Sequence, residues 1–101
     1  MKLYYEKAEY LMDGTLAIRT WHDEDGYKEP YGDVTVNLTC YGMVPEEGHI
    51  FIPTYKLPKD YYQQILDDIV EEVIGPVQIG LGTGVYAKLK DNWENGVEML
   101  E

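Results

Sequence analysis

Alternating apolar and polar positions predict that the chain begins with two strands, at residues 2–11 and 15–22. The turn signal Asp13-Gly14 lies between them. Alternation with a period of two is typical of a half-buried strand, and an Asp-Gly turn joins two such strands into a β-hairpin. A hairpin is therefore predicted at the start of the chain.

Residues 34–41, VTVNLTCY, have the clearest alternation in the chain and predict a third strand. Its apolar face would carry Val34, Val36, Leu38 and Cys40. Asn37, on the polar face, is expected to bond a neighbouring turn, with a surface contact as the alternative. The preceding residues 23–33 contain two glycines, one proline and five acids, so we expect an exposed connection there. Residues 49–55 predict a short fourth strand that Pro53 either ends or confines to a sheet edge. Short connections between the strands indicate an antiparallel meander.

Residues 58–74 show a different period, because pairs of apolar residues recur every four positions and polar pairs fill the gaps. This pattern predicts an amphipathic helix. Pro58 suits a first helical turn, and Gly75-Pro76 is a stop signal. Four carboxylates would form the acidic face of this helix: Asp67, Asp68, Glu71 and Glu72. Burial of the apolar face outweighs the weak repulsion between these charges, so the helix should cover one face of a sheet.

The predicted fold class is α+β, with an antiparallel sheet of about five strands and one helix at about 58–74 on one face, in the order ββββαβ(β). One or two closing strands are expected in residues 76–90, with a hairpin turn or bulge in the glycine-rich stretch 80–84. Residues 1–90 should form a single domain. Residues 91–101 are predicted as a weakly ordered tail, with docking of Trp93 on the body as the alternative. The final Leu100-Glu101 resembles an expression-vector scar and is given no structural weight.

The net charge of the chain disfavours some classes of binding partner. Nineteen acidic residues against eight basic ones give a formal charge of −11, and the basic residues form no patch. Such a field opposes binding to nucleic-acid phosphates and to anionic membranes. With one cysteine and no long apolar run at the N-terminus, a cytoplasmic protein is expected.

No convergent catalytic or metal-binding set is visible. The stretch from His22 to Gly26 matches a calcium loop only in part, because it has no glutamate at the twelfth position, and it predicts an exposed turn. The glycines at 80–84 do not follow a phosphate-binding spacing. Cys40 alternates with apolar residues and is expected to be an inert core residue. We therefore predict no catalytic residue, cofactor or metal.

The remaining candidate for a functional site is the surface of the protein. The acidic face at Asp67, Asp68, Glu71 and Glu72 is the candidate interaction surface, although solubility alone would also explain it. Ten tyrosines suit half-buried sheet positions, a protein-binding patch or a homodimer contact. The predicted function is a non-enzymatic binding or accessory protein that acts on a protein partner. One alternative is a DNA-mimic inhibitor of a DNA-binding or defence protein. The other is a small enzyme or ligand-binding domain with a sheet-face pocket, which would need buried Asp or Glu.

Three blocks carry a family resemblance: Gly14-Thr15-Leu16-Ala17-Ile18, Glu29-Pro30-Tyr31 and Val34-Thr35-Val36-Asn37-Leu38. With Pro45-Glu46-x-Gly48-x-x-Phe51 and the later Gly75-Pro76, the chain resembles the domain of unknown function 4313 family, small acidic proteins of Firmicutes and their mobile elements. The resemblance implies a bacterial setting and supplies no catalytic residues. The sequence departs from that family at Ile52-Pro53-Thr54-Tyr55, where relatives carry an Asp-Thr-Asn-Asn-like stretch.

Overall fold

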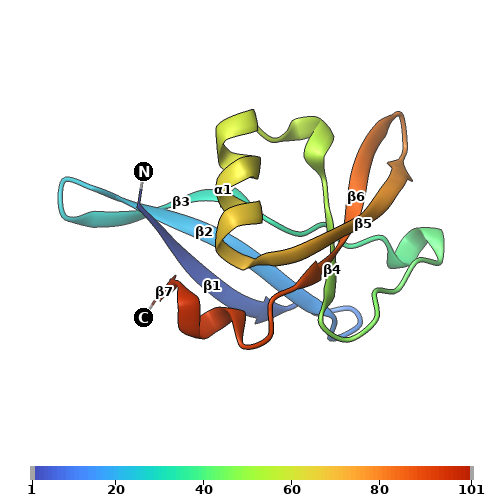
Figure 1. Cartoon of the computed structure of the whole chain (residues 1–101), viewed down its shortest axis with the longest axis horizontal. Helices are drawn as coiled ribbons and strands as arrows, with labels where there is room; N and C mark the ends of the chain where they lie inside the picture. The colour runs from blue at the N-terminus through green and yellow to red at the C-terminus, as the bar shows by residue number, and fades with distance from the viewer. Residues whose placement is uncertain (1, 101) are drawn as a thin grey trace.

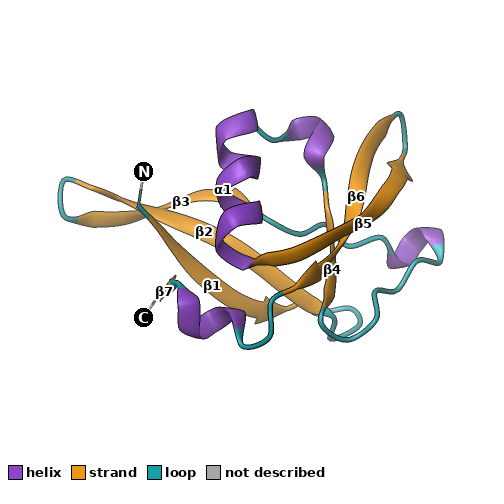
Figure 2. Cartoon of the chain, in the orientation of Figure 1, coloured by secondary structure: helices purple, strands orange, loops and turns teal. Residues whose placement is uncertain are grey.

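The computed structural model describes residues 2–100, which form seven strands in two sheets, one α-helix and three short 3-10 helices (Figure 1, Figure 2). Sheet A has the strand order β3-β2-β1-β7 and contains β1 (Leu3–Glu9), β2 (Leu16–Glu24), β3 (Tyr27–Asp33) and β7 (Glu98–Met99). Sheet B has the order β4-β6-β5 and contains β4 (His49–Ile52), β5 (Val70–Ile79) and β6 (Gly82–Leu89). The helix α1 spans Lys59–Ile69, and the 3-10 helices are η1 (Thr39–Tyr41), η2 (Thr54–Lys56) and η3 (Trp93–Gly96).

The predicted α+β class is confirmed, and the pairings are antiparallel except for β1 with β7. The prediction of one sheet of about five strands is wrong, because the strands divide into two sheets. The division follows from residues 34–48, which carry the chain from the last strand of one hairpin to the first strand of the other sheet.

The first hairpin is confirmed, and its turn is held by one carboxylate. Asp13 Oδ1 accepts hydrogen bonds from the Thr15 amide at 2.9 Å and from the Thr15 hydroxyl at 2.7 Å. These bonds favour the ionised form, so they lower the pKa of Asp13 to about 2. The next residue, Gly14, has φ 73°, a left-handed conformation that glycine adopts without strain.

Residues 27–33 form strand β3 instead of the exposed connection that was predicted. All residues of this strand are exposed except the half-buried Gly32, so the strand is held by its backbone pairing with β2. Such a strand needs no apolar alternation, and Pro30 is tolerated at a sheet edge. The missed signal was Asp25-Gly26 at the tip, where φ values of 50° and 86° fit a two-residue hairpin turn.

Residues 34–41 are not a strand, although their alternation was the clearest in the sequence. The Val34 amide donates to Ile18 O on β2 at 2.9 Å, and the Val36 amide donates to Phe51 O on β4 at 3.0 Å. The segment thus passes from sheet A to sheet B. Its apolar side chains alternate because they are buried in two different clusters, Val34 in one and Leu38 in the other.

The predicted helix over 58–74 is correct at its start and wrong at its end. Pro58 is the N-cap, but α1 ends at Ile69 and β5 begins at the next residue. The β-branched residues of 70–79 pair with β6 as a strand. The stabilisation from this pairing outweighs the helix that the spacing of the apolar residues predicts. Lys90 secures the junction, because its amide donates to Ile69 O at 2.9 Å and its ammonium to Asp67 O at 2.6 Å.

The closing segment forms the long β5–β6 hairpin, and its turn at Gly80 has φ 59°. This confirms the turn predicted in the glycine-rich stretch. Gly75-Pro76 does not stop a helix but lies inside β5, an edge strand of sheet B, where proline costs no ladder hydrogen bond. The fourth predicted strand is present as β4 and ends just before Pro53.

Two clusters make up the core. The larger is formed by sheet A, α1, η3 and one face of sheet B, and includes Tyr5, Ile18, Ile65 and Ile69. The smaller one contains Leu38, Phe51 and Ile79, with Val36 and Met43 packed against it. Residues 34–41, which we call the crossing segment, therefore cover part of the other face of sheet B.

The C-terminal segment, predicted as a weakly ordered tail, packs on the body as far as the structure describes it. Trp93 is 5% exposed and meets the Tyr5 ring edge-on, with 6.2 Å between ring centroids. Strand β7 pairs with β1, and the Leu100 amide donates to Tyr5 O at 2.7 Å. Glu101 lies outside the described residues. Within residues 2–100, α1 is too short and too polar to cross a membrane.

Candidate functional site

The four carboxylates of the predicted acidic face do not lie on one helix. Asp67 and Asp68 belong to α1, whereas Glu71 and Glu72 belong to β5. Asp68 accepts a hydrogen bond from the hydroxyl of the buried Tyr5 at 2.9 Å, so it supports the core. Asp67 accepts one from Gln63 at 3.0 Å.

Two lysines interrupt this acidic set. Lys88 Nζ lies 3.2 Å from Glu71 Oε2, and Glu71, with smaller contributions from Asp91 and Glu72, raises the pKa of Lys88. Lys90 holds the last carbonyls of α1. The four carboxylates and the two lysines therefore form a mixed-charge surface on α1, β5 and the end of β6.

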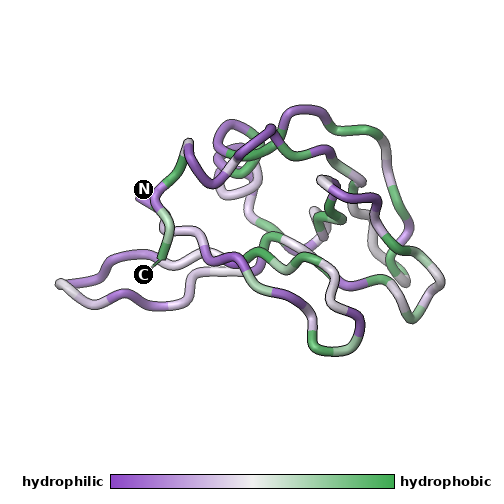
Figure 3. The backbone as a smooth tube through the Cα atoms, turned by 90° about the horizontal axis from the view of Figure 1, so that it is seen from below, coloured by the Kyte–Doolittle hydropathy of each residue, from purple (hydrophilic) through white to green (hydrophobic). Residues whose placement is uncertain are grey.

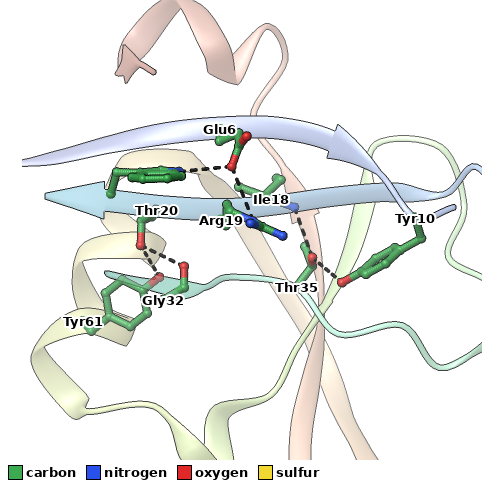
Figure 4. A network of polar contacts seen from close by, with 9 residues as sticks. Glu6, Tyr10, Ile18, Arg19, Thr20, Gly32, Thr35 and Tyr61 are labelled. Atoms are coloured by element: carbon green, nitrogen blue, oxygen red, sulfur yellow. Dashed lines mark hydrogen bonds and ion pairs between the residues drawn. The ribbon is translucent and has the colours of Figure 1, made fainter. Parts of the chain in front are cut away.

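Several tyrosines use their hydroxyls inside the molecule (Figure 4). The buried Tyr61 hydroxyl lies 2.6 Å from Thr20 Oγ1, which in turn donates to Gly32 O at 3.1 Å. The Tyr10 hydroxyl lies 2.8 Å from Thr35 Oγ1, which accepts from the Ile18 amide at 3.1 Å. Burial is the main cause that raises the pKa of Tyr61 to about 12. These two tyrosines are structural, although Tyr61 is buried in α1 and Tyr10 follows the end of β1, so neither occupies the half-buried sheet position that was predicted.

Other tyrosines face solvent. Tyr27 is 76% exposed at the start of β3, Tyr41 is 61% exposed in η1, and Tyr55 is 53% exposed in η2. They are distributed over three elements and form no single tyrosine patch. Of the three, Tyr41 lies directly before residues that line the hollow described next.

A hollow of about 470 Å³, which we name the outer groove, lies on the face of sheet B that the crossing segment covers only in part. One wall is the loop at 42–46 and the other is the middle of β5. Phe51 and Tyr86 lie between them, with their ring centroids 5.0 Å apart. The lining is mainly apolar and comprises Gly42, Met43, Val44, Glu46, Phe51, Ile74, Gly75, Pro76, Val77 and Tyr86.

The walls of the outer groove leave large apolar side chains in solvent. Val44 is 65% exposed on the loop, and Ile74 is 49% exposed on β5 beside Val73 at 40%. The Glu46 amide donates to the Tyr86 hydroxyl at 3.0 Å, which fixes the loop to the sheet. This hydrogen bond therefore fixes the position of one wall relative to the floor of the groove.

A larger cavity, of about 700 Å³, lies where the β1–β2 turn approaches the loop before β4 and η3. Its charged residues include Glu9 and an ion pair of Lys7 with Glu94 at 3.5 Å. Within residues 2–100 the buried polar side chains are Thr20 and Thr35. The buried Asp or Glu on which the enzyme alternative depends is therefore not found in the described part of the chain.

Two single residues differ in how well the sequence placed them. Cys40, expected in the core, is exposed in η1, because residues 34–41 leave the strand path. Asn37 bonds a neighbouring turn, as the commoner role of asparagine predicts: its Oδ1 accepts from the Thr39 amide at 2.9 Å. Its Nδ2 donates to Asp13 Oδ2 at 3.1 Å and ties the crossing segment to the first hairpin.

The residues that line the outer groove were not predicted as a site. Val44 lies in a loop with no periodicity, and Ile74 was assigned to the buried face of a longer helix. The β-branched residues Val70, Val73 and Ile74 favour a strand, but the register shifts between Val70/Glu72 and Val73/Gly75 break the regular alternation of β5 and leave no signal in the sequence.

Comparison with known families gives one match that covers most of the chain. Residues 5–98 match the family model described as domain of unknown function (DUF4313). Neither the search of curated proteins nor that of solved structures gave a match. Because the family model spans nearly the whole sequence, from β1 to β7, the chain belongs to the DUF4313 family.

Proposed function

We propose that this protein is a non-enzymatic binding protein that holds an extended, basic segment of a protein partner in the outer groove of sheet B. The observation that carries the proposal is the exposure of Val44 and Ile74 on facing walls of one apolar hollow. A hollow lined mainly by apolar side chains is a place where a partner's apolar side chains can be buried as anchors.

Charge favours a basic occupant. Glu46 lines the outer groove, and Glu72 lies on β5 two residues before Ile74, whereas Glu71 is paired with Lys88. The whole chain carries −11, which steers cationic partners toward it and repels acidic ones. A segment with apolar side chains for the groove and Lys or Arg beside them matches both the apolar lining and the negative charge around it.

The shape of the groove favours a chain segment over a folded surface. A hollow of about 470 Å³, lined by the loop at 42–46 and by β5, admits a few side chains but not a folded domain. Apolar anchors in such a pocket carry most of the binding energy, while the charged rim sets orientation and association rate.

Capture with matched variants tests the proposal. The full chain serves as bait in a bacterial lysate, beside V44S/I74S and a control, L11S/L81S, which removes two leucines with exposures of 103% and 106% outside the groove. We expect the same partner on the wild type and the control and its loss on V44S/I74S. Cross-linking should place a segment rich in Lys or Arg at the groove.

Equal capture by V44S/I74S and the control would reject the outer groove as the binding surface. Retention of an acidic segment would reject the charge argument. We also expect capture to weaken as salt is raised, because the rim contribution is screened beyond about 10 Å at 0.1 M ionic strength.

A further inference from the structure

We propose that His22, Glu24 and Glu29 bind one divalent transition-metal ion, with Zn²⁺ as the representative, on the β2–β3 hairpin. The three residues come together through strand register. His22 pairs directly with Glu29 across the two strands, and Glu24 lies two residues after His22 on the same face of β2. This site is independent of the outer groove.

Distances support a common ligand. The two carboxylates lie beside different ring nitrogens, with His22 Nδ1 3.6 Å from Glu24 Oε2 and His22 Nε2 3.9 Å from Glu29 Oε2, and an ion would bind one of these nitrogens. One ligand atom from each residue lies within 4.8 Å of the other two. Zinc binds nitrogen and oxygen at about 2.0 to 2.2 Å, which brings tetrahedral ligands to roughly 3.4 Å from one another. Rotation of the two glutamate side chains, which are 61% and 58% exposed, closes the difference.

The histidine is the ordered member of the set. Its side chain is only 23% exposed, and its ring lies edge-on to Tyr31 with 5.3 Å between centroids. Tyr31 packs in the same way on Tyr61, with centroids 5.0 Å apart, and the Tyr61 hydroxyl is held by Thr20. This aromatic column ties the ring to the core, so the orientation of the imidazole ligand is already fixed.

The position on the fold leaves the site open. His22 and Glu24 continue the face of β2 that buries Ile18 and Thr20, beyond the part that the core covers. The hairpin projects away from the body at the end opposite the β5–β6 hairpin, and its trace is mostly hydrophilic (Figure 1, Figure 3). A metal ion there has room for water in its remaining coordination positions.

The donor set selects the class of metal. One imidazole and two carboxylates suit Zn²⁺, Mn²⁺, Fe²⁺ or Co²⁺, whereas Ca²⁺ and Mg²⁺ prefer oxygen ligands alone. The glutamates also bring negative charge that offsets the charge of the ion. A proton on His22 would satisfy the same two carboxylates, so the test has to separate a metal ion from a histidinium.

The experiment is calorimetric titration of the untagged full chain with Zn²⁺, repeated for H22N, E24Q and E29Q. The controls are H49N, which removes the other histidine, and D25N, which removes a carboxylate from the tip of the same hairpin. Co²⁺ absorption gives a second readout that reports coordination, and circular dichroism confirms that each variant folds.

We expect one Zn²⁺ per chain and unchanged binding in H49N and D25N. In H22N, E24Q and E29Q the Kd should rise by more than the roughly tenfold that loss of an outer-shell partner costs. Absence of saturable Zn²⁺ and Co²⁺ binding to the wild type would overturn the proposal. Binding that survives unchanged in H22N would overturn it as well, because the ion would then lie elsewhere.

Discussion

Two threonines show how much of this core depends on single polar atoms. Thr20 and Thr35 are the buried polar side chains of residues 2–100, and each lies within hydrogen-bond distance of a tyrosine hydroxyl (Figure 4). A buried hydroxyl without a partner costs more than the bond itself contributes. The threonines therefore allow Tyr61 and Tyr10 to place their rings in or near the core.

Substitution of the two partners of one pair should have unequal effects. In Thr20→Val the Tyr61 hydroxyl loses its buried partner, and we expect a loss of about 1 to 3 kcal/mol in the free energy of unfolding. In Tyr61→Phe, Thr20 keeps its bond to Gly32 O, and the loss should be about 1 kcal/mol. Urea unfolding of both variants measures the difference. An equal loss, or a larger one in Tyr61→Phe, would contradict this bonding order.

Tyr61 should also make the stability of the protein depend on pH in alkaline solution. Its pKa is raised to about 12 in the fold, against about 10 in an unfolded chain, so the fold binds the phenolic proton more tightly. The resulting stability is complete below about pH 10 and is lost as pH rises toward 12. We expect the free energy of unfolding to fall over this window, with a shallower slope in Tyr61→Phe. The exposed Tyr27→Phe is the control, and its slope should match the wild type.

Single residues were predicted well where the reason was local. Asn37 bonds an adjacent turn, and Asp13-Gly14 forms the first hairpin turn, because both depend on a few neighbouring backbone groups. Cys40 was misplaced since its exposure depends on the path of the whole segment around it.

At the scale of helices and strands, the sequence predicted the type of each element better than the residues at which it ends. The period of α1 is correct up to Ile69, but the next apolar pairs satisfy a strand as readily as a helix, and pairing with β6 decides between them. Residues 34–41 alternate because they cross between two clusters. Long-range pairing of this kind leaves no periodic signal, and the same holds for the outer groove.

Sheet B should not tolerate a side chain at Gly84. A Cβ on Gly84 would lie 2.5 Å from Ile52 O and 2.6 Å from Ile79 Cδ1, so β6 packs against its neighbours with no space for a side chain. We expect Gly84→Ala to lower the free energy of unfolding by about 1 to 3 kcal/mol or more. Gly96→Ala is the control, because nothing lies within 4 Å of its Cβ. Equal stability of the two variants, measured by thermal unfolding, would contradict the packing of β6.

Across the whole molecule, the C-terminal segment closes the core on the side of sheet A. Trp93 buries its ring against Tyr5, and β7 extends the sheet beside β1. The periodicity of the apolar residues indicated an α+β protein, but it did not show that the strands divide into two sheets or that the last residues pack against Tyr5 and β1. Those features depend on contacts between residues far apart in the sequence.

This closure is testable through one side chain. We expect Trp93→Ala to cost about 3 to 5 kcal/mol in the free energy of unfolding, because a buried aromatic ring is replaced by a cavity. The exposed Asn95→Ala, in the same 3-10 helix, should change it by less than about 0.5 kcal/mol. Equal stability of the two variants would show that residues 93–99 do not support the core.

The central claim is that the outer groove binds a basic chain segment. Its most direct measurement is two-dimensional NMR of the labelled chain during titration with a synthetic peptide of the cross-linked partner segment. We predict that the amide signals of Val44, Phe51, Ile74 and Tyr86 shift and that the same peptide leaves V44S/I74S unchanged. Shifts confined to α1 around Asp67 and Asp68, with the groove signals unmoved, would contradict the claim.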